Sequence, residues 1–290
     1  MDKFTVGIEG LGLIGASFAK GFKKRCKDVT VLADNRTRAT LDKAIEDGNV
    51  DGVLDKDSIA SCDILILALY PEASVKYLEE IAPYISKDTI VTDCCGLKRY
   101  ICKEGFRLAD EYGFTYIGGH PMAGTQYSGY DNSKADMFVN ASMILVPDPS
   151  KDEADIADKL EAAKDMLGKL EFGRFVITTP ENHDRMIAMT SQMAHLVSSC
   201  YVKSPGAEEA EGFTGGSFQD LTRVAYLNAG MWTELFLENS DYLLAEIEAV
   251  QRELESYRAA IAAADSDELY RLLDEGSRIK ERILKKNGQD

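Results

Sequence analysis

One histidine stands in a sequence context that suits proton transfer. His120 is one of three histidines among 290 residues, and the strand-like segment 115–117 leads into the run around it, Gly118-Gly119-His120-Pro121-Met122-Ala123-Gly124-Thr125. Histidine is the only side chain whose unperturbed pKa lies within the physiological range. The small residues on both sides let a backbone approach whatever the imidazole faces. At a strand end beside a bound cofactor, His120 would suit proton transfer or hydrogen bonding in redox chemistry.

A glycine-rich turn near the N-terminus predicts where such a cofactor binds. The pattern Gly-x-Gly-x-x-Gly lies between a strand expected at 4–8 and a helix expected from residue 16 to about residue 24. The first glycine permits the turn, the second lets the backbone approach a pyrophosphate, and the third lets helix and strand pack closely. The phosphates then lie at the helix N-terminus, where free N–H groups favour negative charge. We therefore expect a dinucleotide to contact Gly10, Gly12, Leu13, Ile14 and Gly15.

An acidic residue follows at the position that selects the cofactor. A second strand is expected at 29–33 and ends on Asp34, roughly 20 residues after the last glycine, as the fingerprint requires. Asp34 should accept hydrogen bonds from the adenosine ribose and repel a 2′-phosphate, which favours NAD. Arg36 and Arg38 lie just beyond and leave NADP open, because arginine binds phosphate well. Both arginines are equally compatible with solvated positions at a helix start.

Strands and helices continue to alternate through the first half of the chain. Strands are expected at 62–69, 89–92, 115–117, 142–146 and 175–178, with helices at 73–81, 100–112 and 152–170. This pattern predicts an α/β fold with an N-terminal Rossmann-type doubly wound parallel sheet over residues 1–179. Ligands of such sheets bind outside the carboxyl ends of the strands. The segments 70–71, 93–98 and 118–125 fall on that side, so we expect His120 to face the nicotinamide half of the cofactor.

The second half is expected to form a C-terminal all-α domain over residues 180–290, for substrate binding and dimerisation. Pro180 suits the first turn of a helix, and three methionines at helical spacing, Met186, Met189 and Met193, are expected in its core. A short heptad seam favours either a dimer interface or an intrachain core helix. The seam consists of Leu243, Ile247, Val250, Leu254, Tyr257 and Ile261. Ser266 is expected to cap the last helix.

Composition narrows the possible partners and the compartment. A net charge of −16 argues against general affinity for nucleic acid or anionic membranes, which are themselves polyanions. No apolar run has the length of a membrane span, and the start of the chain carries no signal-peptide pattern. The six cysteines include no Cys-x-x-Cys pair and no disulfide-like framework. We therefore expect a cytoplasmic protein with reduced thiols and no metal site.

A weaker signal lies in the second half, at Asp220 and Arg223. Three residues apart on a helix, they suit an ordinary ion pair worth a few tenths of a kcal/mol. Alternatively, Asp220 orients Arg223 so that its guanidinium binds a substrate carboxylate. Trp232, the single tryptophan, is by default a packing residue. The residues alone favour the structural interpretation for all three.

Together these segments resemble the prephenate/arogenate dehydrogenase family over nearly the whole chain. The glycine turn is shared with other dehydrogenases, whereas the run Gly119–Thr125 is more specific. Further matching positions are Ser128, Gly129, Phe138, His183, Asp184, His195, Asp220, Thr222, Arg223, Met231, Trp232 and Asn239. The resemblance implies an NAD-dependent oxidative decarboxylation of a cyclohexadienol in tyrosine biosynthesis. The product would be 4-hydroxyphenylpyruvate from prephenate or tyrosine from arogenate.

The resemblance also implies roles for individual residues. His120 would accept the proton of the C4 hydroxyl, Arg223 would bind a carboxylate of the small dicarboxylate substrate beside Asp220, and His195 would line the substrate pocket. It further implies a homodimer. The rival interpretations are another two-domain Rossmann dehydrogenase, of the β-hydroxyacid or pyrroline-carboxylate reductase type, and a non-catalytic dinucleotide-binding redox sensor.

Three positions depart from the family pattern. Gly96 stands where many members have a serine whose hydroxyl helps to orient the catalytic histidine and the substrate, so either water or Lys98 replaces it or the rate is lower. Gln192 stands where a first histidine is common. Gln126 stands where an acidic residue is often found. Because neutral Gln126 exerts no attraction on the ammonium group of arogenate, we predict a preference for prephenate.

Overall fold

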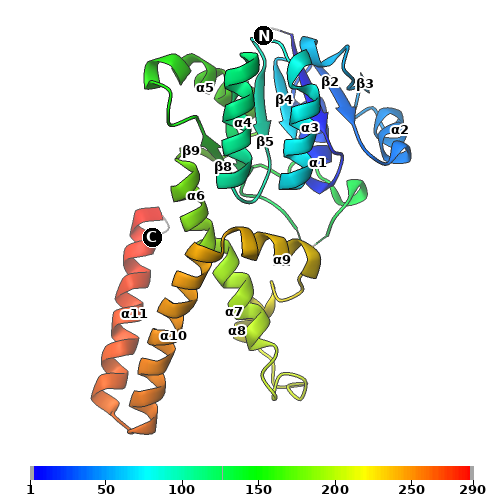
Figure 1. Ribbon diagram of the computed structural model, residues 1–290. Helices are drawn as coiled ribbons and strands as arrows, with labels where there is room; N and C mark the ends of the chain where they lie inside the picture. Colours follow the sequence, from blue (N-terminus) through cyan, green and yellow to red (C-terminus); the bar gives the residue numbers. More distant parts are fainter. Residues whose placement is uncertain (1–2, 126, 288–290) are drawn as a thin grey trace. The chain divides into compact units, whose positions relative to one another are not determined.

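The computed structural model describes residues 3–125 and 127–287, and these form two compact units. One unit ends at Asn239 and the other begins at Ser240. The first contains both sheets and the shorter helices, and the second contains two long helices (Figure 1). The division of roles predicted at residue 180 stays a prediction.

The first unit is built on a six-stranded parallel sheet with the strand order β3-β2-β1-β4-β5-β6. Its strands are β1 (Phe4–Glu9), β2 (Val29–Asp34), β3 (Gly52–Val53), β4 (Ile64–Leu67), β5 (Ile90–Asp93) and β6 (Thr115–Tyr116). The strand order reverses between β1 and β4, as in a doubly wound sheet, and this confirms the predicted fold class. The central strands are continuous apolar runs because helices cover both of their faces.

Two hydrophobic cores show which helices cover which face. The core on one face contains residues of α1 (Leu13–Arg25) and α2 (Arg38–Glu46), with Phe18 and Phe22 fully buried. The core on the other face contains residues of α3 (Pro71–Ile81) and α4 (Arg99–Tyr112) (Figure 1). The glycine turn before α1 and the segment before α4 therefore both lie at the carboxyl ends of the parallel strands.

A second, smaller sheet corrects the prediction for the last strands. Its order is β7 (Gly118–Pro121), β8 (Ser142–Val146) and β9 (Arg174–Ile177), with α5 (Glu153–Gly168) between β8 and β9. Segments 142–146 and 175–178 thus do not extend the parallel sheet. His120 lies within β7, opposite Ile144, and not in a loop, because β7 pairs antiparallel with β8. Short 3-10 turns occur at Ile59–Ser61, Ala82–Tyr84 and Tyr130–Asn132.

The helical part of the first unit begins where it was predicted. Pro180 opens α6 (Pro180–Ile187), and the Thr179 hydroxyl accepts a hydrogen bond from the Asn182 amide at 3.3 Å, as an N-cap does. A π turn at Ala188–Gln192 connects α6 to α7 (Met193–Tyr201). Two shorter helices follow, α8 (Gly216–Thr222) and α9 (Ala229–Glu238). Met193 is buried, but Met186 and Met189 are exposed, so the predicted methionine core is wrong for these two.

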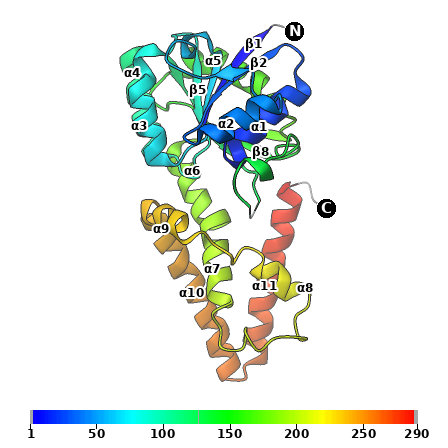
Figure 2. The ribbon, with the colours of Figure 1, turned by 90° about the vertical axis from the view of Figure 1, so that its right-hand side faces the viewer.

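The second unit consists of α10 (Ser240–Ala262) and α11 (Ser266–Asn287), joined by a short turn (Figure 2). The Tyr257 hydroxyl donates a hydrogen bond to the Leu272 carbonyl at 3.1 Å and links the two helices. Asp265 caps α11 by accepting the Glu268 amide, so Ser266 is not the cap. Leu254 and Ile261 of the heptad seam remain mostly exposed. The seam is thus not an intrachain core over these residues.

Candidate active site

The three glycines of the N-terminal turn have the properties that dinucleotide binding requires. Gly10 has a φ of +92°, and a Cβ there would lie 2.7 Å from the Ala68 carbonyl oxygen. A Cβ at Gly15 would lie 1.9 Å from the Gly10 carbonyl oxygen, so only glycine lets α1 pack this closely. At Gly12, in contrast, a Cβ would meet no atom within 4 Å. The space beside Gly12 is therefore available to a ligand, and the turn fits a pyrophosphate.

The start of α1 is suited to an anion. Its N-cap is Gly12, which has no capping side chain, and no acidic residue lies in its first turn. The amides of Leu13, Ile14 and Gly15 are therefore positioned for phosphate oxygens. Two further hydrogen bonds hold the turn against the end of β2, from the Gly10 amide to the Asp34 carbonyl and from the Leu11 amide to the Asn35 side chain, both at 2.9 Å.

The two arginines beyond β2 differ in their surroundings. Arg38 pairs with Asp42 one helical turn later, at 2.8 Å, so its charge is already engaged on the surface of α2. Arg36 is exposed and forms no ion pair with any residue that the structure describes. Arg36 is thus the arginine better placed to meet a phosphate near Asp34.

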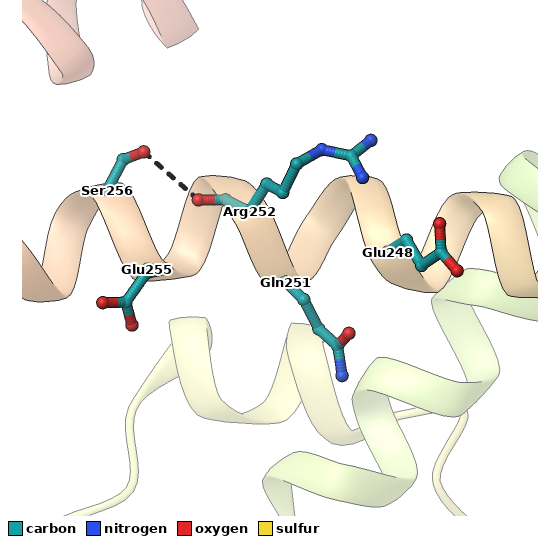
Figure 3. A pocket seen from close by; sticks show the side chains of 5 residues that line it. All are labelled: Glu248, Gln251, Arg252, Glu255 and Ser256. Atoms are coloured by element: carbon teal, nitrogen blue, oxygen red, sulfur yellow. Dashed lines mark hydrogen bonds between the residues drawn. The ribbon is translucent and has the colours of Figure 1, made fainter.

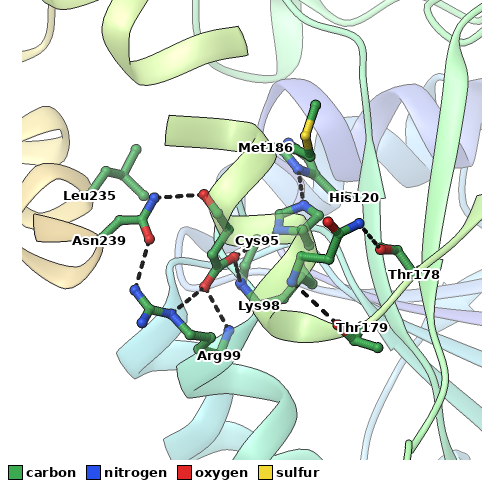
Figure 4. A network of polar contacts seen from close by, with 12 residues as sticks. Cys95, Lys98, Arg99, His120, Thr178, Thr179, Met186, Leu235 and Asn239 are labelled. Carbon is green, nitrogen blue, oxygen red and sulfur yellow. Dashed lines mark hydrogen bonds and ion pairs between the residues drawn. The ribbon is translucent and has the colours of Figure 1, made fainter. Parts of the chain in front are cut away.

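His120 is the end of a hydrogen-bonded chain of three side chains. Its Nδ1 lies 2.9 Å from Nε2 of His183, and Nδ1 of His183 lies 2.7 Å from a carboxylate oxygen of Asp184 (Figure 4). His120 comes from β7, whereas His183 and Asp184 are neighbours on α6. The histidine pair is therefore formed by two elements that are far apart in the sequence.

The partners in this chain determine its tautomers. A carboxylate accepts hydrogen bonds only, so Nδ1 of His183 carries the proton that Asp184 binds. Nε2 of the neutral His183 then accepts from Nδ1–H of His120. Nε2 of His120 keeps its lone pair and is the one nitrogen of the chain that is available to take a proton from a ligand.

Electrostatics keep both rings neutral and the carboxyl ionised. Burial, the positive charge of a protonated His183 and that of Lys98 lower the pKa of His120 well below its ordinary value. Burial also lowers the pKa of His183, although Asp184 opposes the shift. Burial would raise the pKa of Asp184, but the hydrogen bonds from His183 and from the amides of Arg99 and Lys98 outweigh this effect and lower it. A neutral His120 next to an ionised carboxylate can act as a general base.

Asp184 is itself held by the start of α4. Its carboxylate accepts the Lys98 amide at 2.7 Å and the Arg99 amide at 2.9 Å, so a side chain of α6 caps α4. The Arg99 side chain adds a charged hydrogen bond at 3.2 Å. Asp184 is buried, and these bonds account for the stability of its charge there.

A buried amide network continues from Asp184 to α9 (Figure 4). Asn239 donates to the Asp184 carbonyl at 2.9 Å and to the Gln192 side chain at 2.7 Å, and its own carbonyl accepts from Arg99 at 2.8 Å. Gln192 in turn donates to the Leu235 carbonyl at 2.7 Å. Gln192, which stands where a histidine is common, thus ties the π turn to α9.

A buried ion pair between Asp93 and Lys98 anchors β7. Asp93 also accepts hydrogen bonds from the Tyr116 hydroxyl at 2.6 Å and from the Gly119 amide at 3.1 Å. A Cβ at Gly119 would lie 2.3 Å from the Asp93 carbonyl oxygen. Gly119 therefore lets β7 approach β5. Its small size makes room for the backbone of Asp93, and not for a ligand.

This arrangement answers the question raised by Gly96. Lys98 does not replace the missing hydroxyl, because its ammonium group binds Asp93. The partner of His120 is His183. A Cβ at Gly96 would make an ordinary contact with Leu235 at 3.6 Å, so the backbone has room for a small side chain there.

A π turn lies between His183 and His195 and changes the angle between them around the helix axis. They are twelve residues apart, which in a regular helix would place them about 120° apart around the axis. The wider turn at Ala188–Gln192 absorbs about one residue and removes most of this angle. Nδ1 of His195 lies 2.8 Å from the Ser191 carbonyl oxygen, and its ring lies 4.1 Å from that of Trp232. Trp232 thus packs against a predicted site residue.

The structure does not bring all predicted residues together. Asp220 and Arg223 are exposed, and among the described residues no hydrogen bond or ion pair joins them to each other or to the histidine chain. The predicted ion pair and the predicted bracing of Arg223 are therefore both absent from this part of the chain. Gln126 lies outside the residues that the structure describes.

Sequence reasoning missed the functional position of His183 and Asp184. Both were noted as matching positions, but neither was assigned to the site. A histidine directly before an aspartate on a proline-initiated helix was the available signal. The sequence does not show that this helix packs against the strand that carries His120.

Two surface depressions lie elsewhere and contain none of the predicted site residues. One is an open surface along α10, lined by Glu248, Gln251, Arg252, Glu255 and Ser256 (Figure 3). The other lies between α3 and α4 and is lined by Glu72, Ala73, Val75, Lys76, Glu79, Tyr100 and Glu104. Within residues 3–125 and 127–287, no cluster of side chains could hold a metal ion and no helix is long and apolar enough to cross a membrane.

A doubly wound sheet, a glycine turn that fits a pyrophosphate and a neutral histidine on β7, which approaches the carboxyl end of β5, define a dinucleotide-dependent dehydrogenase. Family models support this class and narrow it. The nucleotide-binding domain of prephenate dehydrogenase matches residues 18–172, and the dimerization domain of prephenate dehydrogenase matches residues 179–275. The chain belongs to the prephenate dehydrogenase family.

Individual relatives differ in the substrate that their names state. Cyclohexadienyl dehydrogenase of Zymomonas mobilis is 31% identical over 95% of this chain and 94% of its own length. The crystal structure of Synechocystis arogenate dehydrogenase has a TM-score of 0.81 at 27% identity, covering 96% of this chain and 99% of that one. Prephenate dehydrogenase of Aquifex aeolicus, in complex with hydroxyphenyl propionate and NAD+, has a TM-score of 0.79 at 26% identity, covering 98% and 99%.

Proposed function

We propose that this protein is an NAD-dependent prephenate dehydrogenase, which converts prephenate to 4-hydroxyphenylpyruvate and CO2. The observation that carries the proposal is the chain from Asp184 through His183 to His120, because it leaves Nε2 of a neutral imidazole free to accept a proton. The reaction requires a group of this kind at the ring C4 hydroxyl. The family to which the chain belongs supplies the substrate class.

The residues of this chain have separate tasks in the reaction. Bound NAD+ supplies the acceptor for the hydride that leaves C4. His120 takes the hydroxyl proton as the C4–O bond becomes a carbonyl. When the ring carboxylate departs as CO2, the electron pair of the broken bond makes the ring aromatic and leaves a phenolate oxygen, to which His120 returns the proton. Asp184 stabilises the protonated His120 through His183, because a negative charge at the end of the chain favours the positive charge that forms.

Substrate binding is assigned to helical residues. His195, backed by Trp232, presents its Nε2 as an acceptor, since its Nδ1 donates to a backbone carbonyl. Arg223 has the bidentate geometry that a carboxylate requires, and Asp220 lies one helical turn before it. Both are exposed, and Arg223 forms no ion pair within residues 3–125 and 127–287, so a carboxylate of the bound substrate would be its negatively charged partner.

NAD is proposed as the cofactor because Asp34 ends β2 beside the glycine turn. Arg36 is the residue that would favour NADP instead. NAD+ is bound in the related Aquifex structure. An NAD cofactor is also what Asp34 favours in this chain.

One assay tests the activity. Formation of NADH or NADPH is followed spectroscopically with prephenate and arogenate, each with NAD+ and NADP+, for the wild type and His120→Asn. We expect prephenate-dependent NADH formation by the wild type and a loss of kcat of about 10²–10⁴-fold in the variant, the range of general-base catalysis. A protein that binds NAD+ but forms no NADH with either substrate would instead be a redox sensor.

Arogenate is the second candidate substrate, because the Zymomonas relative is named for cyclohexadienyl substrates and the Synechocystis relative for arogenate. Neutral Gln126 underlies the preference for prephenate. Gln126→Glu should raise kcat/KM for arogenate relative to prephenate, since a carboxylate attracts the ammonium group. No relative gain would contradict the role of Gln126.

A homodimer in the cytoplasm is proposed as the working state. The dimerization-domain match covers most of the second half, and exposed apolar residues of α10, Leu254 and Ile261, are available for a partner helix. Light scattering after gel filtration would test it: a monomeric mass at micromolar concentration would contradict the dimer.

A further inference from the structure

Glu9 is a buried acid that the proposed reaction does not use. It is the last residue of β1, directly before Gly10, and only 7% of its surface is exposed. One of its carboxylate oxygens, Oε2, has no hydrogen-bond partner. A buried acid with an unsatisfied oxygen is costly, so its position at the cofactor turn requires an explanation.

The surroundings of Glu9 are acidic. Its register partner on the neighbouring parallel strand is Asp34, and register partners in a sheet project to the same face. The groups that face its carboxyl are Asp34 on β2 and Tyr77 on α3. Burial and the charge of Asp34 raise the pKa of Glu9 to about 7, although a hydrogen bond from Tyr77 opposes the shift. No Lys or Arg contributes to this shift.

We propose that Glu9 is a second cofactor-selecting carboxylate, which acts with Asp34 to exclude a ribose 2′-phosphate and takes up a proton when a phosphorylated dinucleotide binds. The inference rests on the proposed dinucleotide site and concerns which dinucleotide it accepts. A 2′-phosphate carries up to two negative charges near neutral pH. A 2′-phosphate next to Asp34 would be repelled by a second carboxylate, that of Glu9. Because Glu9 is buried, its surroundings screen this repulsion poorly.

The two carboxylates differ in how their repulsion of a 2′-phosphate can be reduced. Asp34 is partly exposed, whereas Glu9 is buried and can lower its charge only by binding a proton. Removing Asp34 alone therefore leaves a repulsive charge at pH 8. Acidification to pH 6 should lower that charge without any mutation, because burial and the charge of Asp34 raise the pKa of Glu9 to about 7.

Equilibrium binding without substrate tests the proposal. The affinities of NAD+ and NADP+ are measured by titration calorimetry at pH 6 and pH 8 for the wild type, Glu9→Gln, Asp34→Asn and the double variant. At pH 8, Glu9→Gln should bind NADP+ about tenfold more tightly, the factor that one pKa unit of interaction represents, with NAD+ little changed. At pH 6 the gain should largely disappear, and the double variant should bind NADP+ most tightly of the four.

Proton uptake provides an independent reading. In the wild type near pH 7, the heat of NADP+ binding should depend on the ionisation enthalpy of the buffer more strongly than in Glu9→Gln, which retains only the proton equilibrium of the phosphate itself. Tyr77→Phe removes the hydrogen bond that opposes protonation, so it should move the pH dependence upward. Exposed Glu46 on α2 supplies the matched control, Glu46→Gln, which should behave like the wild type.

The outcomes separate two failures. An unchanged ratio of NADP+ to NAD+ affinity in Glu9→Gln, or an equal change in both, would overturn the role of Glu9 and leave it a structural acid. Absence of NAD+ binding in every protein, the wild type included, would overturn the dinucleotide site itself. Glu9→Met, of similar volume, repeats the measurement if the glutamine variant does not fold.

Discussion

The glycine turn and the histidine chain lie in the same unit, yet they are assembled in different ways. The turn from β1 through Gly15 to Asp34 is made by consecutive elements of the chain, β1, α1 and β2, although Gly10 also packs against Ala68. The histidine chain joins β7 to α6, and it is held by hydrogen bonds from the start of α4 and from Asn239 at the end of α9. The glycine turn can be lost by a change in the backbone at one residue. The histidine chain, in contrast, depends on how β7, α6, α4 and the end of α9 pack together.

The largest effect is expected at Asp184. In Asp184→Asn the amide can donate to Nδ1 of His183, which would reverse the tautomers and place a proton on Nε2 of His120. We expect kcat to fall by about 10²–10⁴-fold, the contribution of a general base, with NAD+ affinity unchanged. Nitrogen NMR of the imidazoles in both proteins reads the tautomers directly.

The matched control is Asp42→Asn, because Asp42 forms only a surface ion pair with Arg38. It should leave both kcat and the imidazole signals unchanged. Unaltered tautomers and normal kcat in Asp184→Asn would show that the histidine chain does not depend on its carboxylate.

Two glycines of the turn should separate folding from binding. In Gly15→Ala the new Cβ meets the Gly10 carbonyl oxygen, so we expect the free energy of unfolding to fall by about 1–3 kcal/mol, as in overpacked interiors. In Gly12→Ala the Cβ meets no protein atom, so the fold should be stable while NAD+ binding weakens strongly. Thermal unfolding and calorimetric titration measure the two properties. Normal NAD+ affinity in Gly12→Ala would contradict a pyrophosphate beside this residue.

The pH dependence of stability should reveal Glu9. Its pKa in the folded protein, about 7, is above its ordinary value of 4.5, so the folded state binds the proton more tightly. Its carboxyl therefore disfavours folding progressively as pH rises from about 4.5 to 7. In Glu9→Gln this loss should be absent, which makes the variant more stable than the wild type at pH 8 by on the order of 1–3 kcal/mol.

Denaturant titrations at pH 5 and pH 8 measure this difference. Glu46→Gln, an exposed substitution, should follow the wild type at both values. Equal stability of Glu9→Gln and the wild type at pH 8 would mean that Glu9 is not destabilised by its surroundings.

The smallest effect is expected at Gly96. A serine side chain fits there sterically, but His120 already has His183 as its partner. Gly96→Ser should therefore change kcat by less than about tenfold, a barrier difference under 1.4 kcal/mol. A larger gain in steady-state kcat would show that the missing hydroxyl limits the wild type, and that the histidine chain does not replace it.

Local contacts explain which parts of the fold were predictable. The dinucleotide site was predictable because its parts follow one another in the chain: β1, the glycine turn, α1 and Asp34. Their spacing alone indicated it. The start of α6 was predictable for the same reason, since Thr179 and Pro180 act on the next turn. The cap of α11 was misassigned by a single residue, because Asp265 and Ser266 are both good caps.

Contacts between distant segments explain what was missed. The strand expected at 115–117 stopped short of His120 because the four residues of β7, two of them glycines, give no strand pattern, and only pairing with β8 makes β7 a strand. Met186 and Met189 were expected in the core because periodicity does not say which face of a helix is covered. Asp220 and Arg223 were expected to interact, but spacing on a short helix does not compel two exposed side chains to pair.

The sequence by itself determined the class of this protein. The glycine spacing, the acid after β2 and the residues around His120 depend on local backbone geometry, which the sequence carries directly. Only the tertiary structure decided how His120 can act as a base, because its partner lies 63 residues away on α6. It also placed Glu9 beside Asp34, since strand pairing, and not sequence distance, brings two carboxylates to one face of the sheet.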